Sequence, residues 1–139
     1  MNINGTWYNQ LGSQMVLQVN GKNIQGTYHT KVGDASGIYE LTGKMDIDND
    51  ASTAIGWVVL WNNQYGSSDS VTTWSGQIQE IAGEETIVTT WLLTAETEDD
   101  DNWHSTLVGK DVFTRLLPSK SEQENNSLHG VKSSAPLVK

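Results

Sequence analysis

The chain of 139 residues carries eight basic and seventeen acidic side chains, a net charge of −9, which fits one domain and argues against nucleic acid or an anionic membrane as a partner. It contains no cysteine, which excludes disulfides and thiolate metal sites, and no apolar run approaches the roughly 18 residues of a membrane span. These features leave the compartment open: we expect a secreted protein if a signal peptide has been removed and an intracellular one otherwise.

Short runs rich in Thr, Val, Ile, Trp and Tyr alternate with turn residues along the chain, a pattern typical of an antiparallel β meander. The predicted strands lie near 5–10, 14–20, 23–31, 38–46, 53–63, 70–80, 85–95 and 103–116. Eight strands in up-and-down order can close around one small ligand. We therefore predict an all-β fold, an eight-stranded antiparallel up-and-down β-barrel, in preference to a sandwich.

The composition changes after Pro118. Residues 119–139 contain no aromatic side chain and no apolar periodicity, and they include three Lys and two Glu. The acidity therefore belongs to the preceding residues, which carry five basic and fifteen acidic side chains. We predict a barrel domain over 1–118 and a flexible polar C-terminal tail over 119–139.

The two faces of each predicted strand differ, and the apolar face also carries polar groups. Because side chains alternate along a strand, Tyr28 falls on the face opposite His29 and Lys31. The same reasoning places these polar residues inside, among several Trp: Asn9, Ser13, Tyr28, Thr30, Ser70, Thr72 and Asp111. An unpaired buried hydroxyl or amide costs about 1–3 kcal/mol. Each residue alone is more simply a hydrogen-bonded core residue, but the group together favours a polar ligand.

The chemistry of this group suggests recognition of a compact ring. Hydroxyls, an amide and a phenol can converge as donors on a carbonyl oxygen, while the carboxylate of Asp111 accepts from an N–H. A cyclic urea or amide presents both kinds of group. Tryptophan rings supply flat apolar walls that exclude water from these hydrogen bonds.

Six stretches carry a resemblance to a known family: GTWYNQLGS, LTGK, GWVVLWNN, TTWSGQ, TTWLLT and W-x-STLVG-x-D-x-F at 103–113. Over about residues 3–117 the chain resembles the avidin/streptavidin family of biotin-binding barrels. The resemblance implies high-affinity, non-covalent binding of biotin and a role in sequestering this vitamin. It also implies that the protein is not an enzyme and needs no cofactor, since biotin is the bound ligand.

The resemblance implies a role for each polar residue. Asn9, Ser13 and Tyr28 would donate to the ureido oxygen of biotin. Thr30 and Asp111 would accept from the two ureido N–H groups.

The remaining contacts follow from the same resemblance. Thr72 would face the ring sulfur, while Ser70 and the backbone N–H of Asp34 would meet the carboxylate. The side chain of Asp34 could repel that carboxylate by a modest, screened amount. The rings and the pentanoyl chain would be lined by Trp61, Trp74, Trp91, Leu11, Val32 and Leu93.

The resemblance also implies a homotetramer. Trp103 stands at the position that closes the pocket of a neighbouring subunit in tetrameric members. Lys110, on the outward face of the last strand, would bring like charges together at a subunit contact. We therefore expect a tetramer with one weak interface.

Other interpretations are open to test. An enzyme could pair Asp111 with His29 or His104. Alternation, however, puts both histidines on the outward faces of their strands, opposite the inward face that carries Asp111. A lectin-like or lipocalin-like barrel could use the same Trp-rich interior for another ligand. The acidic run at 96–101 fits a solvated hairpin tip better than a Ca²⁺ loop, because it lacks the glycine turn of such loops. Finally, the end of the chain, 135–139, could reach a neighbouring pocket as a self-ligand.

Overall fold

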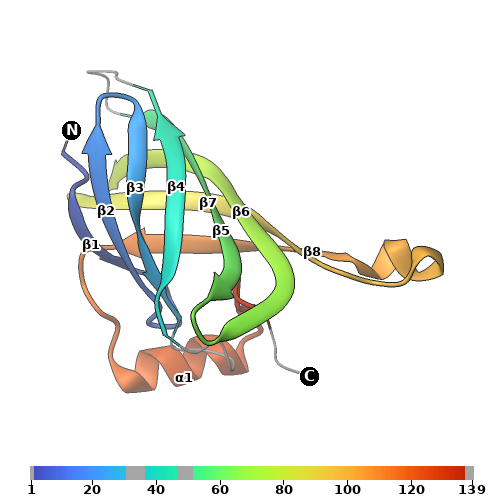
Figure 1. Cartoon of the computed structure of the whole chain (residues 1–139). Helices are drawn as coiled ribbons and strands as arrows, with labels where there is room; N and C mark the ends of the chain where they lie inside the picture. Colours follow the sequence, from blue (N-terminus) through green and yellow to red (C-terminus); the bar gives the residue numbers. More distant parts are fainter. Residues whose placement is uncertain (1, 31–36, 47–51, 137–139) are drawn as a thin grey trace.

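A computed structural model describes residues 2–30, 37–46 and 52–136. Its eight strands form a closed barrel in which each strand pairs with its neighbours in chain order, all antiparallel (Figure 1). The predicted up-and-down barrel is therefore confirmed. The strands are β1 (Gly5–Tyr8), β2 (Gln14–Asn20), β3 (Asn23–His29), β4 (Tyr39–Met45), β5 (Thr53–Asn63), β6 (Gly66–Ile81), β7 (Glu84–Ala95) and β8 (Thr106–Thr114).

Several strand boundaries differ from the sequence-based prediction by one to four residues, and three of these differences concern the ends of the barrel. β1 ends at Tyr8 instead of residue 10, because the side chain of Asn9 accepts from the backbone N–H groups that follow and turns the chain. β6 begins at Gly66, four residues before the predicted start. β8 begins at Thr106 because Asp99–His104 form a short 3₁₀ helix, η1, at the acidic hairpin tip.

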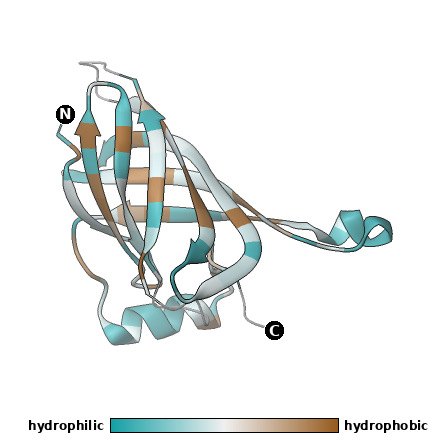
Figure 2. Cartoon of the chain, in the orientation of Figure 1, coloured by the Kyte–Doolittle hydropathy of each residue, from teal (hydrophilic) through white to brown (hydrophobic). Residues whose placement is uncertain are grey.

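The interior of the barrel is rich in tryptophan. Brown apolar segments alternate with teal polar ones along the strands in Figure 2, as expected when one face of each strand is buried. Trp57 stacks on Trp74 with ring centroids 5.5 Å apart, and Phe113 meets Trp57 edge to face. The fully or almost fully buried tryptophans are Trp7, Trp57, Trp61, Trp74 and Trp91.

The seam between the first and last strands is narrow. β1 pairs with β8 through Tyr8 and Thr114 alone among the strand residues that the structure describes. Side chains extend this closure: the Arg115 guanidinium donates to the carbonyl oxygens of Asn2 and Asn4, both at 3.0 Å. It also lies over the ring of Trp7, 3.9 Å from the centroid.

The hairpin formed by β7 and β8 extends beyond the barrel wall and carries η1 at its tip (Figure 1). Leu107, which alternation assigns to the apolar inner face, is 52% exposed. Leu107 still pairs with the buried Leu93 of β7, so its face is the one that alternation gives, but this part of β8 lies past the rim, where no opposite wall covers it. Trp103 in η1 is 74% exposed.

The chain after the barrel departs from the flexible tail predicted for 119–139. Helix α1 (Lys120–Leu128) lies across one end of the barrel (Figure 1), and its N-terminus is capped by Ser119, whose Oγ accepts from Glu122 N–H at 3.2 Å. Ser134 and Ala135, which follow, are buried. The polar composition of this segment suggests a flexible tail, but contacts at its ends hold the helix and the barrel covers the residues after it. The domain boundary at residue 118 stays a prediction.

No helix in the described ranges is both long enough and apolar enough to cross a membrane.

Candidate ligand-binding site

The loop between β1 and β2 supplies the first polar group of the site. Asn9 directs its side chain inward, where Oδ1 accepts from Leu11 N–H at 3.0 Å and from Ser13 N–H at 2.9 Å. Gly12 completes this turn with φ +85°, a conformation that favours glycine. The amide oxygen of Asn9 is therefore occupied by the loop, and its Nδ2 is the group that points into the barrel.

Asn9, Tyr28 and Asp111 meet in the interior although they come from three different parts of the chain. The amide Nδ2 of Asn9 donates to Tyr28 Oη at 3.4 Å and to Asp111 Oδ1 at 3.5 Å. Trp74 Nε1 donates to the other carboxyl oxygen of Asp111 at 2.9 Å. The structure thus brings together the amide, the phenol and the carboxyl that the sequence placed inside the barrel, and an indole N–H also donates to the carboxyl.

Ser13 and Thr30 complete the polar end of the site. Their hydroxyl oxygens lie 3.4 Å apart, and both residues are buried. Thr89, which was not predicted, donates from its hydroxyl to the backbone oxygen of Asp111 at 2.9 Å and so helps to fix that residue on β8. No sequence signal separates Thr89 from other inward threonines.

Burial changes the acid–base properties of this cluster. It raises the pKa of the Asp111 carboxyl above its ordinary value, and hydrogen bonds from Trp74, Ser134 and Asn9 oppose that shift. Burial also raises the pKa of the Tyr28 phenol, and the nearby Asp111 carboxylate adds to the effect. Tyr28 therefore stays protonated at neutral pH and is able to donate a hydrogen bond.

A second group of polar side chains lies on β5 and β6. Trp61 Nε1 donates to the hydroxyl of Thr72 at 2.8 Å, and Thr72 is fully buried. Ser70, also buried, shares a hydrogen bond of 2.9 Å with the hydroxyl of Ser68. The structure thus places both predicted β6 hydroxyls on the inner face.

The apolar residues predicted to line the site are buried where the structure describes them. Trp91 and Trp74 occupy the inner faces of adjacent strands, paired in register. Gly109 on β8 leaves room for Trp91, because a Cβ atom at this position would overlap the indole ring. Tyr39, a further contact not predicted, packs edge to face on Trp61 with centroids 4.9 Å apart. The buried lining residues are Leu11, Trp61, Trp74, Trp91 and Leu93.

Three predicted residues remain to be placed. Val32 and Asp34 lie outside the described residues. Trp103 lies on the projecting hairpin and is exposed, so in a single chain it makes no contribution to the pocket. His104 is in the same exposed turn, paired in ring contact with Trp103, which removes it from any dyad with the buried Asp111.

Besides Thr89 and Tyr39, the structure adds a third residue that the sequence did not indicate. Ser134, from the chain beyond α1, is buried with its hydroxyl 3.3 Å from Tyr28 Oη, and its backbone oxygen accepts from the Thr72 hydroxyl at 2.6 Å. The prediction of a self-ligand named the adjacent residues 135–139 and a neighbouring pocket. In the structure, Ser134 contacts the interior of its own barrel.

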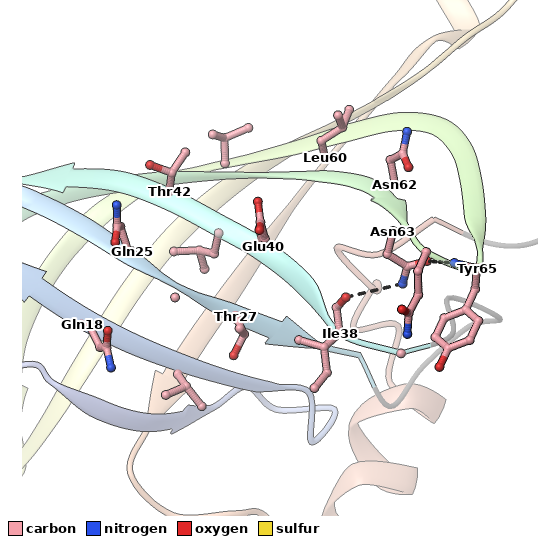
Figure 3. A pocket seen from close by; sticks show the side chains of 16 residues that line it. Gln18, Gln25, Thr27, Ile38, Glu40, Thr42, Leu60, Asn62, Asn63 and Tyr65 are labelled. Carbon is pink, nitrogen blue, oxygen red and sulfur yellow. Dashed lines mark hydrogen bonds between the residues drawn. The ribbon is translucent and has the colours of Figure 1, made fainter.

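A separate hollow lies on the outer face of β2–β5 (Figure 3). It is an open groove of about 1150 Å³, lined by side chains such as Gln18, Gln25, Glu40 and Leu60. Its polar, widely spaced groups do not converge on one point, in contrast to the cluster around Asp111. We therefore place the candidate site inside the barrel.

Comparison with known proteins agrees with this geometry. The family model described as the avidin family matches residues 1–116. The chain is 34% identical to avidin of Gallus gallus over 126 residues, covering 85% of this chain and 80% of that protein. It is 30% identical to afifavidin of Afifella pfennigii over 127 residues, covering 86% and 73%. The chain therefore belongs to the avidin family, whose members are biotin-binding proteins and not enzymes, so the predictions of family and of a non-enzymatic role are confirmed.

Proposed function

We propose that the barrel interior binds biotin non-covalently and with high affinity, and that the protein thereby sequesters the vitamin. The observation that carries this proposal is the convergence of the Tyr28 phenol and the Asp111 carboxyl on the Asn9 amide, whose Nδ2 lies 3.4 and 3.5 Å from them. A cyclic urea offers one acceptor and two donors, and this cluster offers the complementary groups.

The polar end of the site fits the ureido ring. Asn9 Nδ2, Ser13 and Tyr28 would donate to the ureido oxygen, while Thr30 and Asp111 would accept from the ring N–H groups. The contacts of Asn9 with Tyr28 and Asp111, at 3.4 and 3.5 Å, and of Ser13 with Thr30, at 3.4 Å, are longer than the usual range of about 2.7–3.2 Å. Such loose contacts leave each group able to exchange its partner for a ligand atom.

The rest of biotin would occupy the aromatic part of the barrel. Thr72 would face the ring sulfur, Ser70 and the backbone of Asp34 would meet the carboxylate, and the buried tryptophans would enclose the rings. Because these walls exclude water, each hydrogen bond to the ligand would be stronger than at the surface.

A titration with biotin tests this function directly. Intrinsic tryptophan fluorescence should change and saturate at one biotin per chain, because Trp61, Trp74 and Trp91 line the pocket. As controls, 2-imidazolidinone retains the cyclic urea and should compete weakly, whereas pentanoic acid lacks it and should not compete. If stoichiometric biotin leaves the fluorescence unchanged, the function is wrong, and sugars or other small ligands of lectin-like and lipocalin-like barrels become the next candidates.

We also propose that the protein is a homotetramer with one weak interface, in which Trp103 completes a neighbour's site. The support is an exposed apolar patch on the projecting hairpin: Leu92 and Val108 face each other across β7 and β8, and both are about half exposed. Lys110, opposite Thr90 on the outward side, brings positive charge to the same face. Mass measurement on dilution should show dimers appearing before monomers, and only stable dimers at every concentration would contradict a tetramer.

A further inference from the structure

We infer that residues 133–136 are an internal ligand: they fill the pocket of their own chain and must leave before another ligand enters. The entry of another ligand rests on the proposed binding of biotin, whereas the occupancy of the pocket by this segment does not. The segment therefore makes this protein a self-inhibited binder.

Contacts to Ser134 carry this inference. Ser134 and Ala135 are 1% and 2% exposed, and Pro136 is also buried, although all three lie near the end of the chain. The Ser134 hydroxyl meets Tyr28 Oη at 3.3 Å, and its backbone oxygen accepts from the Thr72 hydroxyl at 2.6 Å. Since Thr72 in turn accepts from Trp61 Nε1 at 2.8 Å, a short chain of hydrogen bonds runs from the barrel wall to the segment.

These are the groups that a ligand would need. Tyr28 is proposed to donate to the ureido oxygen and Thr72 to face the sulfur, so Ser134 occupies the space between the two proposed ends of the biotin ring system. A serine hydroxyl and a peptide carbonyl offer the same donor and acceptor chemistry as a cyclic amide. The segment and such a ring cannot be in the pocket together, so their binding is mutually exclusive.

Helix α1 holds the segment at the entrance to the pocket. Asn126 Nδ2 donates to the backbone oxygen of Gln10 at 3.0 Å, and the side chain of Gln123 packs against Gly12, so the helix rests on the loop that carries Asn9. Past the helix, Gly130 has φ +83° and reverses the chain toward the barrel. A ligand tethered in this way has a high effective concentration, in the millimolar range for short flexible links.

The expected effect on an incoming ligand follows from the occupancy. If the segment fills the pocket for 90–99% of the time, both the apparent affinity and the association rate of biotin fall by about 10–100-fold. The dissociation rate should not change, because the segment is outside the pocket in the bound state. Release of the segment should therefore accelerate association alone.

Three variants of the 139-residue chain distinguish the effect of the segment from that of the rest of the chain. Ser134→Glu places a carboxylate beside Asp111 and should expel the segment by charge repulsion and desolvation. Gly130→Pro prevents the turn after α1, since proline cannot adopt a positive φ, and leaves every pocket residue unchanged. Ser127→Glu is the matched control, because this serine is exposed on α1 and receives the same substitution.

The first measurement needs no biotin. In NMR spectra of the ligand-free protein, the indole N–H resonance of Trp61 should shift in both Ser134→Glu and Gly130→Pro, and it should stay in place in Ser127→Glu. The indole of Trp7, which donates to Ile3 O at 2.9 Å, is the internal reference and should not move. A peptide with the sequence of residues 131–136 should restore the Trp61 resonance when added to Ser134→Glu. If Trp61 is unchanged in both releasing variants, or if its shift in the wild type depends on protein concentration, occupancy by the segment of its own chain is refuted.

The second measurement uses stopped-flow mixing with biotin. Association should be about 10–100-fold faster in the two releasing variants than in the wild type and in Ser127→Glu, with one dissociation rate for all four proteins. Equal association rates in all four would overturn the gating role. If Trp61 responds as expected but no protein binds biotin, the proposed function fails while the internal ligand stands.

Discussion

Substitution of Asn9 by alanine should lower both the stability of the protein and its affinity for biotin, because the side-chain oxygen and nitrogen of Asn9 make different contacts. Oδ1 accepts from Leu11 N–H and Ser13 N–H at 3.0 and 2.9 Å inside the β1–β2 loop, while Nδ2 points to Tyr28 and Asp111. A buried N–H left without an acceptor costs about 1–3 kcal/mol, so Asn9→Ala should lower the free energy of unfolding by about 2–6 kcal/mol. Loss of the proposed donor should also weaken biotin by about 1–3 kcal/mol, or roughly 5–150-fold.

Ser13→Ala is the comparison that tests this reasoning. It removes another proposed donor but no acceptor for the loop, so binding should fall by a similar factor while stability falls by only about 0.5–1.5 kcal/mol. Urea unfolding of the biotin-free proteins, followed by tryptophan fluorescence, measures the first quantity, and biotin association and dissociation rates give the second. Equal unfolding midpoints for the two variants would refute the bracing role of Asn9, and unchanged biotin binding by both would place the pocket elsewhere.

Three further substitutions test other parts of the barrel. Asp111→Asn should flatten the pH dependence of the stability of the protein, because it removes the titrating carboxyl. The raised folded-state pKa means that wild-type stability falls as the pH rises from about 3.8 through that pKa, and urea midpoints from pH 4 to 8 should show the slope in the wild type alone. Gly109→Ala should cost about 1–3 kcal/mol by overpacking against Trp91, visible as a lower unfolding midpoint, and an unchanged midpoint would mean that the indole can move aside. Arg115→Ala should cost about 1–3 kcal/mol through lost contacts with Trp7 and the N-terminal carbonyls, with faster hydrogen exchange in β1 as the check, and wild-type exchange there would contradict the seam described above.

The fold was predictable because its determinants are local. Alternation along a strand has an exact period of two, so the inward set containing Tyr28, Thr72 and Asp111 follows from the sequence once the strands are recognised. Alternation does not reveal the exposure of Leu107, where the strand continues past the rim of the barrel. Alternation indicates which face a residue occupies, but it carries no information about where the opposite wall ends.

The end of the chain was less predictable, although one signal for its helix was present. Ser119 and Glu122 have the spacing of a capping box, and Gly130 stands where a helix commonly ends. The helix was missed because α1 has no apolar face to give a 3.6-residue period. The burial of Ser134 could not be read from the sequence at all, since it depends on the position of α1 against a loop from the other end of the chain.

The narrow seam has a consequence for the order in which the molecule assembles. Seven of the eight strand pairings that the structure describes join consecutive strands, so the meander can grow by adding hairpins with little loss of chain entropy. Only the pairing of Tyr8 with Thr114 joins opposite ends of the chain, and it concentrates the entropic cost of ring closure into one step. That step also brings Asn9 to Asp111. The ability to bind a ligand should therefore appear last during refolding. It should follow the recovery of native tryptophan fluorescence, which reports the strands that form earlier.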